Sequence, residues 1–308
     1  MKKYTLLYIL GAGLLSACDL LEPADVVNPN VVEEDFTSTP DAMQTWVNGT
    51  NACFGTCISK FAELTGLLSD DLYNNSSRSA KTFDVLDVLY TDTEVANLAT
   101  QVGKMIEMAD FGLESVAAAD ASTTPAMQFN LCYIKAVAYL LGAENFVALP
   151  KEARGQVLTS KELAAEAVSV LETAGTYATS DSDKALLALL KARAYRLLGN
   201  TANAQTEAAK ALSLDKSLLL QVQFDAMNGF VNTLQEYVST QLFTILPRLE
   251  KQAVKCPLSG LSEQPIAVAK IEEAYLILAE TNLSAGNLTA AQGHLNNLLN
   301  AVAARNDS

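Results

Sequence analysis

Apolar residues recur every three or four positions over several stretches of the chain, which is the spacing of one face of an α-helix. This pattern predicts helices over residues 39–64, 93–118 and 124–141, and a fourth helix that begins at Thr159-Ser160. The apolar stripe of the first helix contains Met43, Trp46, Val47, Phe54, Ile58, Phe61 and Leu64.

The ends of these helices are predicted from their capping residues. Thr39 followed by Pro40 is typical of an N-cap and the first helical position. Gly142 is typical of a residue that ends a helix. Residues 67–88 are polar and have no period, so we expect a long loop there. Residues 217–266 predict an irregular segment with at least one helix near 230–243.

Two later stretches of the chain have the same predicted arrangement of helices. Residues 184–214 and 268–304 each predict two helices joined at a glycine, Gly199 and Gly286. This resembles a tetratricopeptide unit, in which small residues let the paired helices pack closely. The small residues at the expected crossings are Ala192, Ala204, Ala208, Ala211, Ala279 and Ala291. We therefore predict a single, mainly α domain of tetratricopeptide-like helix pairs with irregular connecting segments.

Residues 1–17 have the pattern of a lipoprotein signal peptide. Two lysines precede an apolar run that is too short to span the ~30 Å core of a bilayer. The run ends in Leu15-Ser16-Ala17-Cys18, which resembles a bacterial lipobox, so we expect cleavage before Cys18 and lipidation of its thiol. Acyl chains such as palmitate, at ~0.8 kcal/mol per buried methylene, make a durable anchor. The alternative is a simple secretory signal with an incidental cysteine.

The predicted domain organisation follows from this leader. Residues 18–38 contain Pro23 and Pro29 and predict an extended, lipidated tether. The helical domain then occupies residues 39–308. A formal net charge of −14 argues against nucleic acid as a partner, because both would be strongly negative.

Four more cysteines follow Cys18: Cys53, Cys57, Cys132 and Cys256. Cys53 and Cys57 lie four positions apart on a predicted helix, which holds their Cβ atoms about 5–6 Å apart. A disulfide prefers about 3.8 Å, so buried free thiols are the commoner outcome. The spacing of the cysteines is unlike that of zinc sites, and we expect neither a metal nor a cofactor.

No arrangement of residues predicts catalysis, so we expect no enzyme. His294 is the only histidine and lies in a predicted helix without a motif, which favours a structural role. The adjacent Asp70 and Asp71 would point apart, and solvation in a loop is the simpler interpretation. Glu273 and Glu280 share a helix face and are expected to be structural, paired with basic or backbone groups where they are buried.

Exposed aromatic and amide side chains are the candidates for ligand binding. Trp46 lies on the apolar stripe of the first helix, where packing in the core is favoured. Tyr73 lies instead in the polar stretch 67–88, beside Asn74, Asn75 and Arg78. We predict that these four residues face a ligand.

Several segments, in this order, resemble the SusD/RagB family of outer-membrane nutrient-binding lipoproteins. They are the opening from Cys18 to Pro23 with Asn28-Pro29, Glu34-Asp35-Phe36 and Thr39-Pro40-Asp41-Ala42, the helix from Tyr133 to Gly142 before Pro150, Pro247-Arg248-Leu249, and the block from Ile271 to Glu280 with Gly286-Asn287.

The resemblance implies a binding protein at the cell surface, anchored in the outer membrane. Members of this family act as a lid on a TonB-dependent, SusC-like transporter and pass glycans or peptides inward. Asp19 argues against the outer membrane as the location, because in enteric bacteria an aspartate after the lipidated cysteine retains lipoproteins at the inner membrane. The alternative function is a lipid-anchored helical-repeat scaffold that binds a protein partner.

Overall fold

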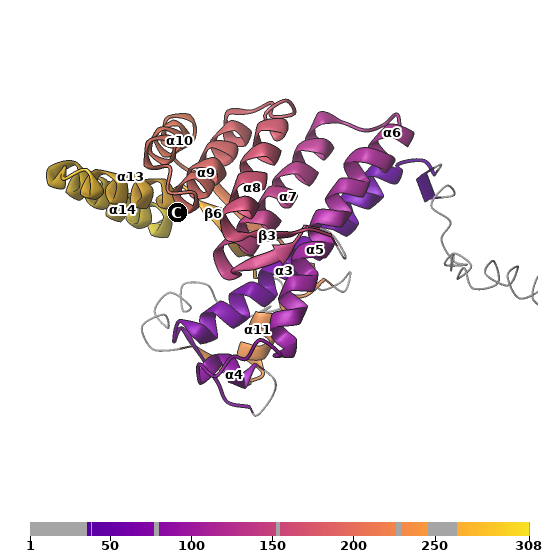
Figure 1. Ribbon diagram of the computed structural model, residues 1–308, viewed down its shortest axis with the longest axis horizontal. Helices are drawn as coiled ribbons and strands as arrows, with labels where there is room; N and C mark the ends of the chain where they lie inside the picture. Colours follow the sequence, from indigo (N-terminus) through magenta and orange to yellow (C-terminus); the bar gives the residue numbers. More distant parts are fainter. Residues whose placement is uncertain are drawn as a thin grey trace, which may run out of the picture. The chain divides into compact units, whose positions relative to one another are not determined.

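Most of the described chain is α-helical, as the spacing of its apolar residues predicts (Figure 1). The computed structural model describes residues 36–37, 39–76, 80–151, 155–225, 230–245 and 264–307. Its longer helices are α3 (Ala42–Leu68), α5 (Thr93–Phe111), α7 (Pro125–Asn145), α8 (Ser160–Ala174), α9 (Asp181–Leu197), α10 (Thr201–Leu214), α13 (Glu272–Ser284) and α14 (Leu288–Asp307). The shorter ones are α4 (Lys81–Asp84), α6 (Ala117–Ala119) and α11 (Thr233–Ser239), and a π-helical turn, Gly112–Val116, joins α5 to α6.

The helices of residues 41–308 pack in pairs. Helix α7 packs against α8, α9 against α10, and α13 against α14, and Figure 1 shows the two members of each pair side by side. The last two pairs are those that the sequence predicts. Each turns at a glycine with a positive φ, +73° at Gly199 and +78° at Gly286, which glycine adopts without steric cost. The small residues at the α9–α10 crossing are buried, as predicted: Ala192, Ala204, Ala208 and Ala211.

Three two-stranded antiparallel sheets join the helices. Strand β1 (Leu72–Asn74) pairs with β5 (Phe243–Ile245), β2 (Ala148–Pro150) with β3 (Val157–Thr159), and β4 (Leu219–Val222) with β6 (Ile266–Lys270). The prediction of a long loop over 67–88 is therefore wrong in part, because this stretch contains the end of α3, β1 and α4. Strands this short carry too few residues for an alternating pattern to show.

The predicted start of the first helix is also wrong. Helix α3 begins at Ala42, and Thr39 does not cap it. Its N-cap residue is Asp41, which has a φ of +58° and makes no capping bond with its side chain. The carboxylate of Asp120 caps the helix instead, because it accepts a hydrogen bond from the Met43 N–H at 2.9 Å. A cap supplied from 77 residues away leaves no local signal.

Gly142 does not end its helix. Helix α7 continues to Asn145, and Gly142 lies buried inside it. A Cβ at this position would meet Leu149 Cδ1 at 3.2 Å and Leu163 Cδ1 at 3.4 Å. The glycine therefore permits the close approach of β2 and α8 to α7. Gly142 is therefore needed for close packing, whereas Gly199 is needed for the turn between two helices.

The core forms around α7, whose side chains are buried on nearly every face. The predicted packing of Trp46 is confirmed, because its ring lies 4.7 Å from that of Phe111 and its Nε1 donates to the Met108 carbonyl at 2.7 Å. Cys53, Cys57 and Cys132 are buried free thiols, and Cys256 lies outside the described residues. Within the part of the chain described, no helix combines the length and apolar character needed to cross a bilayer.

Candidate functional site

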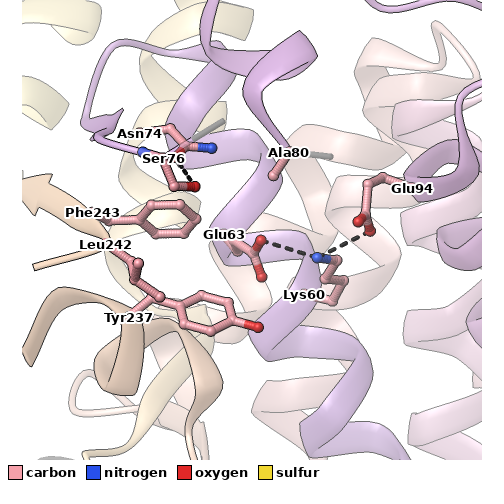
Figure 2. Close-up of a pocket in the computed structure, with 9 residues that line it drawn as sticks. All are labelled: Lys60, Glu63, Asn74, Ser76, Ala80, Glu94, Tyr237, Leu242 and Phe243. Atoms are coloured by element: carbon pink, nitrogen blue, oxygen red, sulfur yellow. Dashed lines mark hydrogen bonds and ion pairs between the residues drawn. The ribbon is translucent and has the colours of Figure 1, made fainter. Parts of the chain in front are cut away.

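A small pocket lies between the last third of α3, the start of α5 and the segment 237–243. It has a volume of about 60 Å³. Figure 2 shows Asn74 and Ser76 together on one side of it, with Lys60 and Glu94 across from them. The residues that line the pocket are Lys60, Glu63, Asn74, Ser76, Ala80, Glu94, Tyr237, Leu242 and Phe243.

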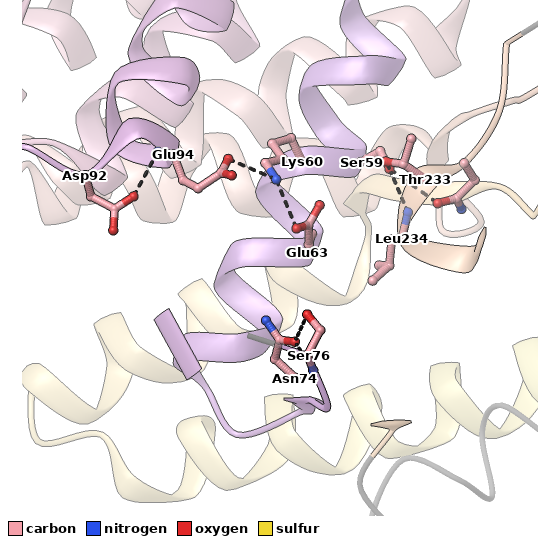
Figure 3. Close-up of polar contacts among 10 residues, drawn as sticks. Ser59, Lys60, Glu63, Asn74, Ser76, Asp92, Glu94, Thr233 and Leu234 are labelled. Atoms are coloured by element: carbon pink, nitrogen blue, oxygen red, sulfur yellow. Dashed lines mark hydrogen bonds and ion pairs between the residues drawn. The ribbon is translucent and has the colours of Figure 1, made fainter. Parts of the chain in front are cut away.

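The charged wall of the pocket consists of one lysine between two glutamates. The Lys60 ammonium lies 2.9 Å from Glu63 Oε1, one turn further along α3, and 3.0 Å from Glu94 Oε2 in the first turn of α5 (Figure 3). The Glu63 side chain is 3% exposed and that of Glu94 10%. Asp92 positions Glu94, because it caps α5 by accepting the Glu94 N–H at 2.9 Å.

The electrostatics of this wall follow from its burial. Burial raises the pKa of the Glu63 carboxyl, Lys60 lowers it, and the nearby charge of Glu94 raises it again, so that the net shift is upward. Burial disfavours the charged form of Lys60, yet Glu63 and Glu94 together hold the lysine pKa above its ordinary value. The ammonium is therefore firmly charged at neutral pH.

The amide wall is Asn74, which is 1% exposed at the end of β1. Its Oδ1 accepts hydrogen bonds from the N–H and the hydroxyl of Ser76, at 2.9 and 2.8 Å. The Asn74 backbone is held as well, because its N–H donates to Asp84 at 3.3 Å and its carbonyl accepts from Lys81 at 2.8 Å. The side-chain nitrogen, Nδ2, finds no acceptor among the described residues.

The aromatic wall comes from the carboxyl-terminal part of the chain. Tyr237 of α11 and Phe243 of β5 meet edge to face, with ring centroids 5.3 Å apart. Hydrogen bonds fix this segment to α3, because the Ser59 hydroxyl lies 3.0 Å from the Thr233 hydroxyl and 3.3 Å from Asn232 Oδ1 (Figure 3). The pocket therefore combines a cation, two carboxylates, an unsatisfied amide donor and an aromatic surface.

The four residues predicted to face a ligand have different surroundings. Asn74 lines the pocket. Tyr73 is 49% exposed on the opposite side of β1, and the Lys81 ammonium lies 4.3 Å from its ring centroid. Asn75 holds the segment after α11, because its Nδ2 donates to the Gln241 carbonyl at 3.0 Å. Arg78 lies outside the described residues.

Sequence reasoning missed Lys60, Glu63 and Glu94. A signal for the first two was present, since a charged pair three positions apart interrupts the buried stripe of α3 beside Phe61 and Leu64. Their partner on α5 lies 31 positions beyond Glu63, and only the packing of the two helices brings Glu94 to them. In the described part of the chain, no cluster of three or more His, Cys, Asp or Glu could hold a metal ion.

The remaining charged residues named from the sequence lie away from the pocket. Glu273 is half-buried and lies 3.9 Å from Arg193, so it pairs with a basic group as predicted. Glu280 is exposed and makes a bidentate contact with Arg196. His294 is half-buried on α14.

Helix pairs of tetratricopeptide type, joined by irregular segments and short two-stranded sheets, define a SusD-like fold. Among solved structures, the chain is similar to one described as a SusD-like carbohydrate binding protein from Bacteroides vulgatus. The TM-score is 0.63, the sequence identity is 14%, and the match covers 84% of this chain and 74% of the other. No protein-family model matches the chain, and a search of curated proteins finds no relative.

Proposed function

We propose that this protein is a nutrient-binding lipoprotein of the outer membrane that captures a glycan at the cell surface. The observation that carries the proposal is the SusD-like fold, shared with a carbohydrate binding protein. The lipobox ending in Cys18 supports the anchor, and the family resemblance supports a TonB-dependent, SusC-like transporter as the partner.

The pocket supports a sugar as the ligand better than a peptide. Sugar hydroxyls donate and accept hydrogen bonds at once, and the pocket offers both carboxylate acceptors and an amide donor. An aromatic ring beside such groups is suited to the apolar C–H face of a sugar. The function proposed is binding and delivery, with no chemical step.

The test is to purify the lipidated protein from membranes in mild detergent, identify what accompanies it, and screen it against immobilised glycans. We expect a TonB-dependent barrel in the preparation and binding to at least one glycan. Cys18→Ala is the matched control for the anchor, and it should move the protein out of the membrane fraction without changing glycan binding. A preparation that binds no glycan and carries a stable soluble partner instead of a barrel would favour the scaffold alternative.

A further inference from the structure

Helix α14 lies at one end of the row of helix pairs formed by residues 41–308 (Figure 1). Its main contact is with α13, the other member of its pair. Of the α14 side chains that the structure describes, only that of Ala291 is buried. Half-buried residues follow it at steps of three and four and complete the face that packs on α13: His294, Leu298 and Ala301.

A second apolar stripe on α14 is exposed to solvent. Its members, with their exposed fractions, are Leu288 (66%), Leu295 (44%), Leu299 (66%) and Val302 (40%). With Gln292 they follow one another at steps of four and three, the spacing with which two helices pack along a seam. A helix turns about 100° per residue, which places this stripe roughly 90° from the face against α13. Helix α13 therefore covers only part of the apolar surface of α14.

The charge of α14 indicates what covers the exposed stripe. Helical repeats at the end of a stack usually present a polar outer face, so an apolar stripe there marks a contact surface. Residues 288–304 contain no Asp, Glu, Lys or Arg, whereas the whole chain has a net charge of −14. Two copies of the chain therefore repel each other least where they meet through α14. A second copy also supplies an equally uncharged apolar helix.

The stripe is matched to itself by symmetry. Leu295 lies at its centre, with Leu288 seven positions before it and Val302 seven positions after it. In a dimer with a twofold axis, residue i of one copy meets residue j of the other, and j meets i. Two antiparallel α14 helices with Leu295 on the axis bring Leu288 of each copy against Val302 of the other.

The length of the stripe limits the strength of such a contact. At about 1.5 Å per residue, residues 288–302 span about 21 Å. Stable complexes bury roughly 1,200–2,000 Å² in total, and one helix face of this length buries less. A dimer formed through α14 is therefore weak and reversible, with a dissociation constant on the order of 100 µM.

We propose that the exposed stripe of α14 is a contact surface for a second copy of this chain. The two α14 helices pair in antiparallel orientation about a twofold axis at Leu295. This inference goes beyond the proposed function and does not depend on it, because no residue of α14 is among the described residues that line the pocket.

The experiment is sedimentation equilibrium of the mature protein carrying Cys18→Ala, which has no acyl chains that could associate by themselves. We expect a reversible equilibrium between monomer and dimer over roughly 10 µM to 1 mM protein. Added salt should strengthen the dimer, because it screens the repulsion between two acidic chains. A monomer at every concentration, or a series of larger oligomers, would overturn the proposal.

Two matched variants locate the contact on α14. Leu299→Glu introduces a carboxylate into the stripe and should weaken the dimer by at least about tenfold, because the charge loses water in the contact. Asn297→Glu adds the same charge at an exposed position roughly on the opposite side of the helix and should leave the dimer unchanged. Equal weakening by both substitutions would contradict a contact through this stripe. Melting curves confirm that both variants are folded.

A disulfide tests the position of the axis. Under oxidised glutathione, Leu295→Cys should link two copies covalently, whereas Asn297→Cys should not, because only the side chains at the axis come within bonding distance. Both variants also carry Cys256→Ser, and Cys53, Cys57 and Cys132 are buried. Equal linking of the two variants would refute the antiparallel pairing.

The alternative occupants of the stripe give different results. If Leu299→Glu releases a TonB-dependent barrel from the membrane preparation and the wild-type protein is monomeric, the stripe binds the transporter. If the wild-type protein is monomeric and Leu299→Glu lowers its melting temperature more than Asn297→Glu does, another segment of the same chain covers the stripe. Either result overturns the assignment to a second copy, and neither bears on glycan binding.

Discussion

At the residue scale, two glycines in the long helices have opposite surroundings. Gly103 of α5 faces open space, since a Cβ there meets nothing within 4 Å. A Cβ on Gly55 of α3 would lie 2.1 Å from Phe230 Cζ and 2.7 Å from Val222 Cγ1. Gly55 thus lets the segment that precedes α11 lie directly on α3, whereas Gly103 only adds backbone freedom to the unfolded chain.

The first prediction contrasts these positions. Gly103→Ala should increase the free energy of unfolding by about 0.5–1 kcal/mol, because alanine has the higher helix propensity. Gly55→Ala should decrease it by about 1–3 kcal/mol, because Phe230 and Val222 must move. Urea denaturation of both variants measures the difference. Equal stabilisation by the two substitutions would mean that Val222 and Phe230 do not lie against α3.

The residue scale is also where sequence reasoning about the pocket is weakest. Asn74 was selected because it lies in a polar stretch, and the structure places it in the pocket wall. Tyr73 is predicted as an exposed aromatic and Asn75 as its neighbour. The alternation of β1 places the Tyr73 side chain on the opposite side of the strand from Asn74, and the Asn75 side chain bonds to the Gln241 carbonyl. The charged wall depends on contact between α3 and α5, which no local pattern encodes.

At the element scale, the hairpin of α9 and α10 is defined by small residues at the helix crossing. Ala204 is 1% exposed at this contact, and Ala209 lies on the exposed face of the same helix. Ala204→Trp should lower the free energy of unfolding by about 1–3 kcal/mol or more, because the helices cannot separate without losing their other contacts. Ala209→Trp is the matched control and should be nearly neutral. Thermal melting distinguishes them, and similar melting temperatures would contradict the observed helix face.

Long elements were predicted well and short ones were not. The α9–α10 and α13–α14 pairs have a repeated apolar period and turn at glycines with positive φ, so their existence and turns follow from local chemistry. The strands are three to five residues long and pair with segments as distant as β1 and β5. The Thr39 and Gly142 boundaries failed because a cap from Asp120 and the packing of Leu149 replaced the local rules.

At the scale of the whole molecule, Arg193 on α9 connects three other elements. Its Nη2 donates to Glu144 of α7 at 2.6 Å, its Nη1 donates to the Val268 carbonyl of β6 at 3.4 Å and lies 3.9 Å from Glu273 of α13. The side chain is 23% exposed. Arg196, one turn later, pairs with Glu280 but is 53% exposed. The two arginines are therefore a natural comparison between a half-buried and an exposed ion pair.

Arg193→Leu should lower the free energy of unfolding by about 2 kcal/mol at neutral pH, because Glu144 and Glu273 lose their charged partner. Arg196→Leu should cost less than about 1 kcal/mol, since water screens an exposed pair.

Burial already raises the pKa of Glu273, and Arg193 lowers it, so Arg193→Leu raises the pKa of Glu273 further. A carboxyl with a raised pKa destabilises the folded state when it is ionised, and the Arg193→Leu deficit should therefore shrink as the pH falls toward about 4. Urea titrations at several pH values test this, and a deficit that grows in acid would refute it.

The pocket is assembled from residues 60–94 and 237–243, two segments separated by most of the folded domain. A chain is synthesised at roughly 5–20 residues per second, so on the order of ten seconds pass between the emergence of Glu94 and that of Tyr237. During this interval β1 has no β5 to pair with, and Ser59 of α3 lacks its partners Asn232 and Thr233. The pocket is consequently among the last features of the described structure to form. A nascent chain can form the helices that have already emerged, but it cannot yet form the pocket.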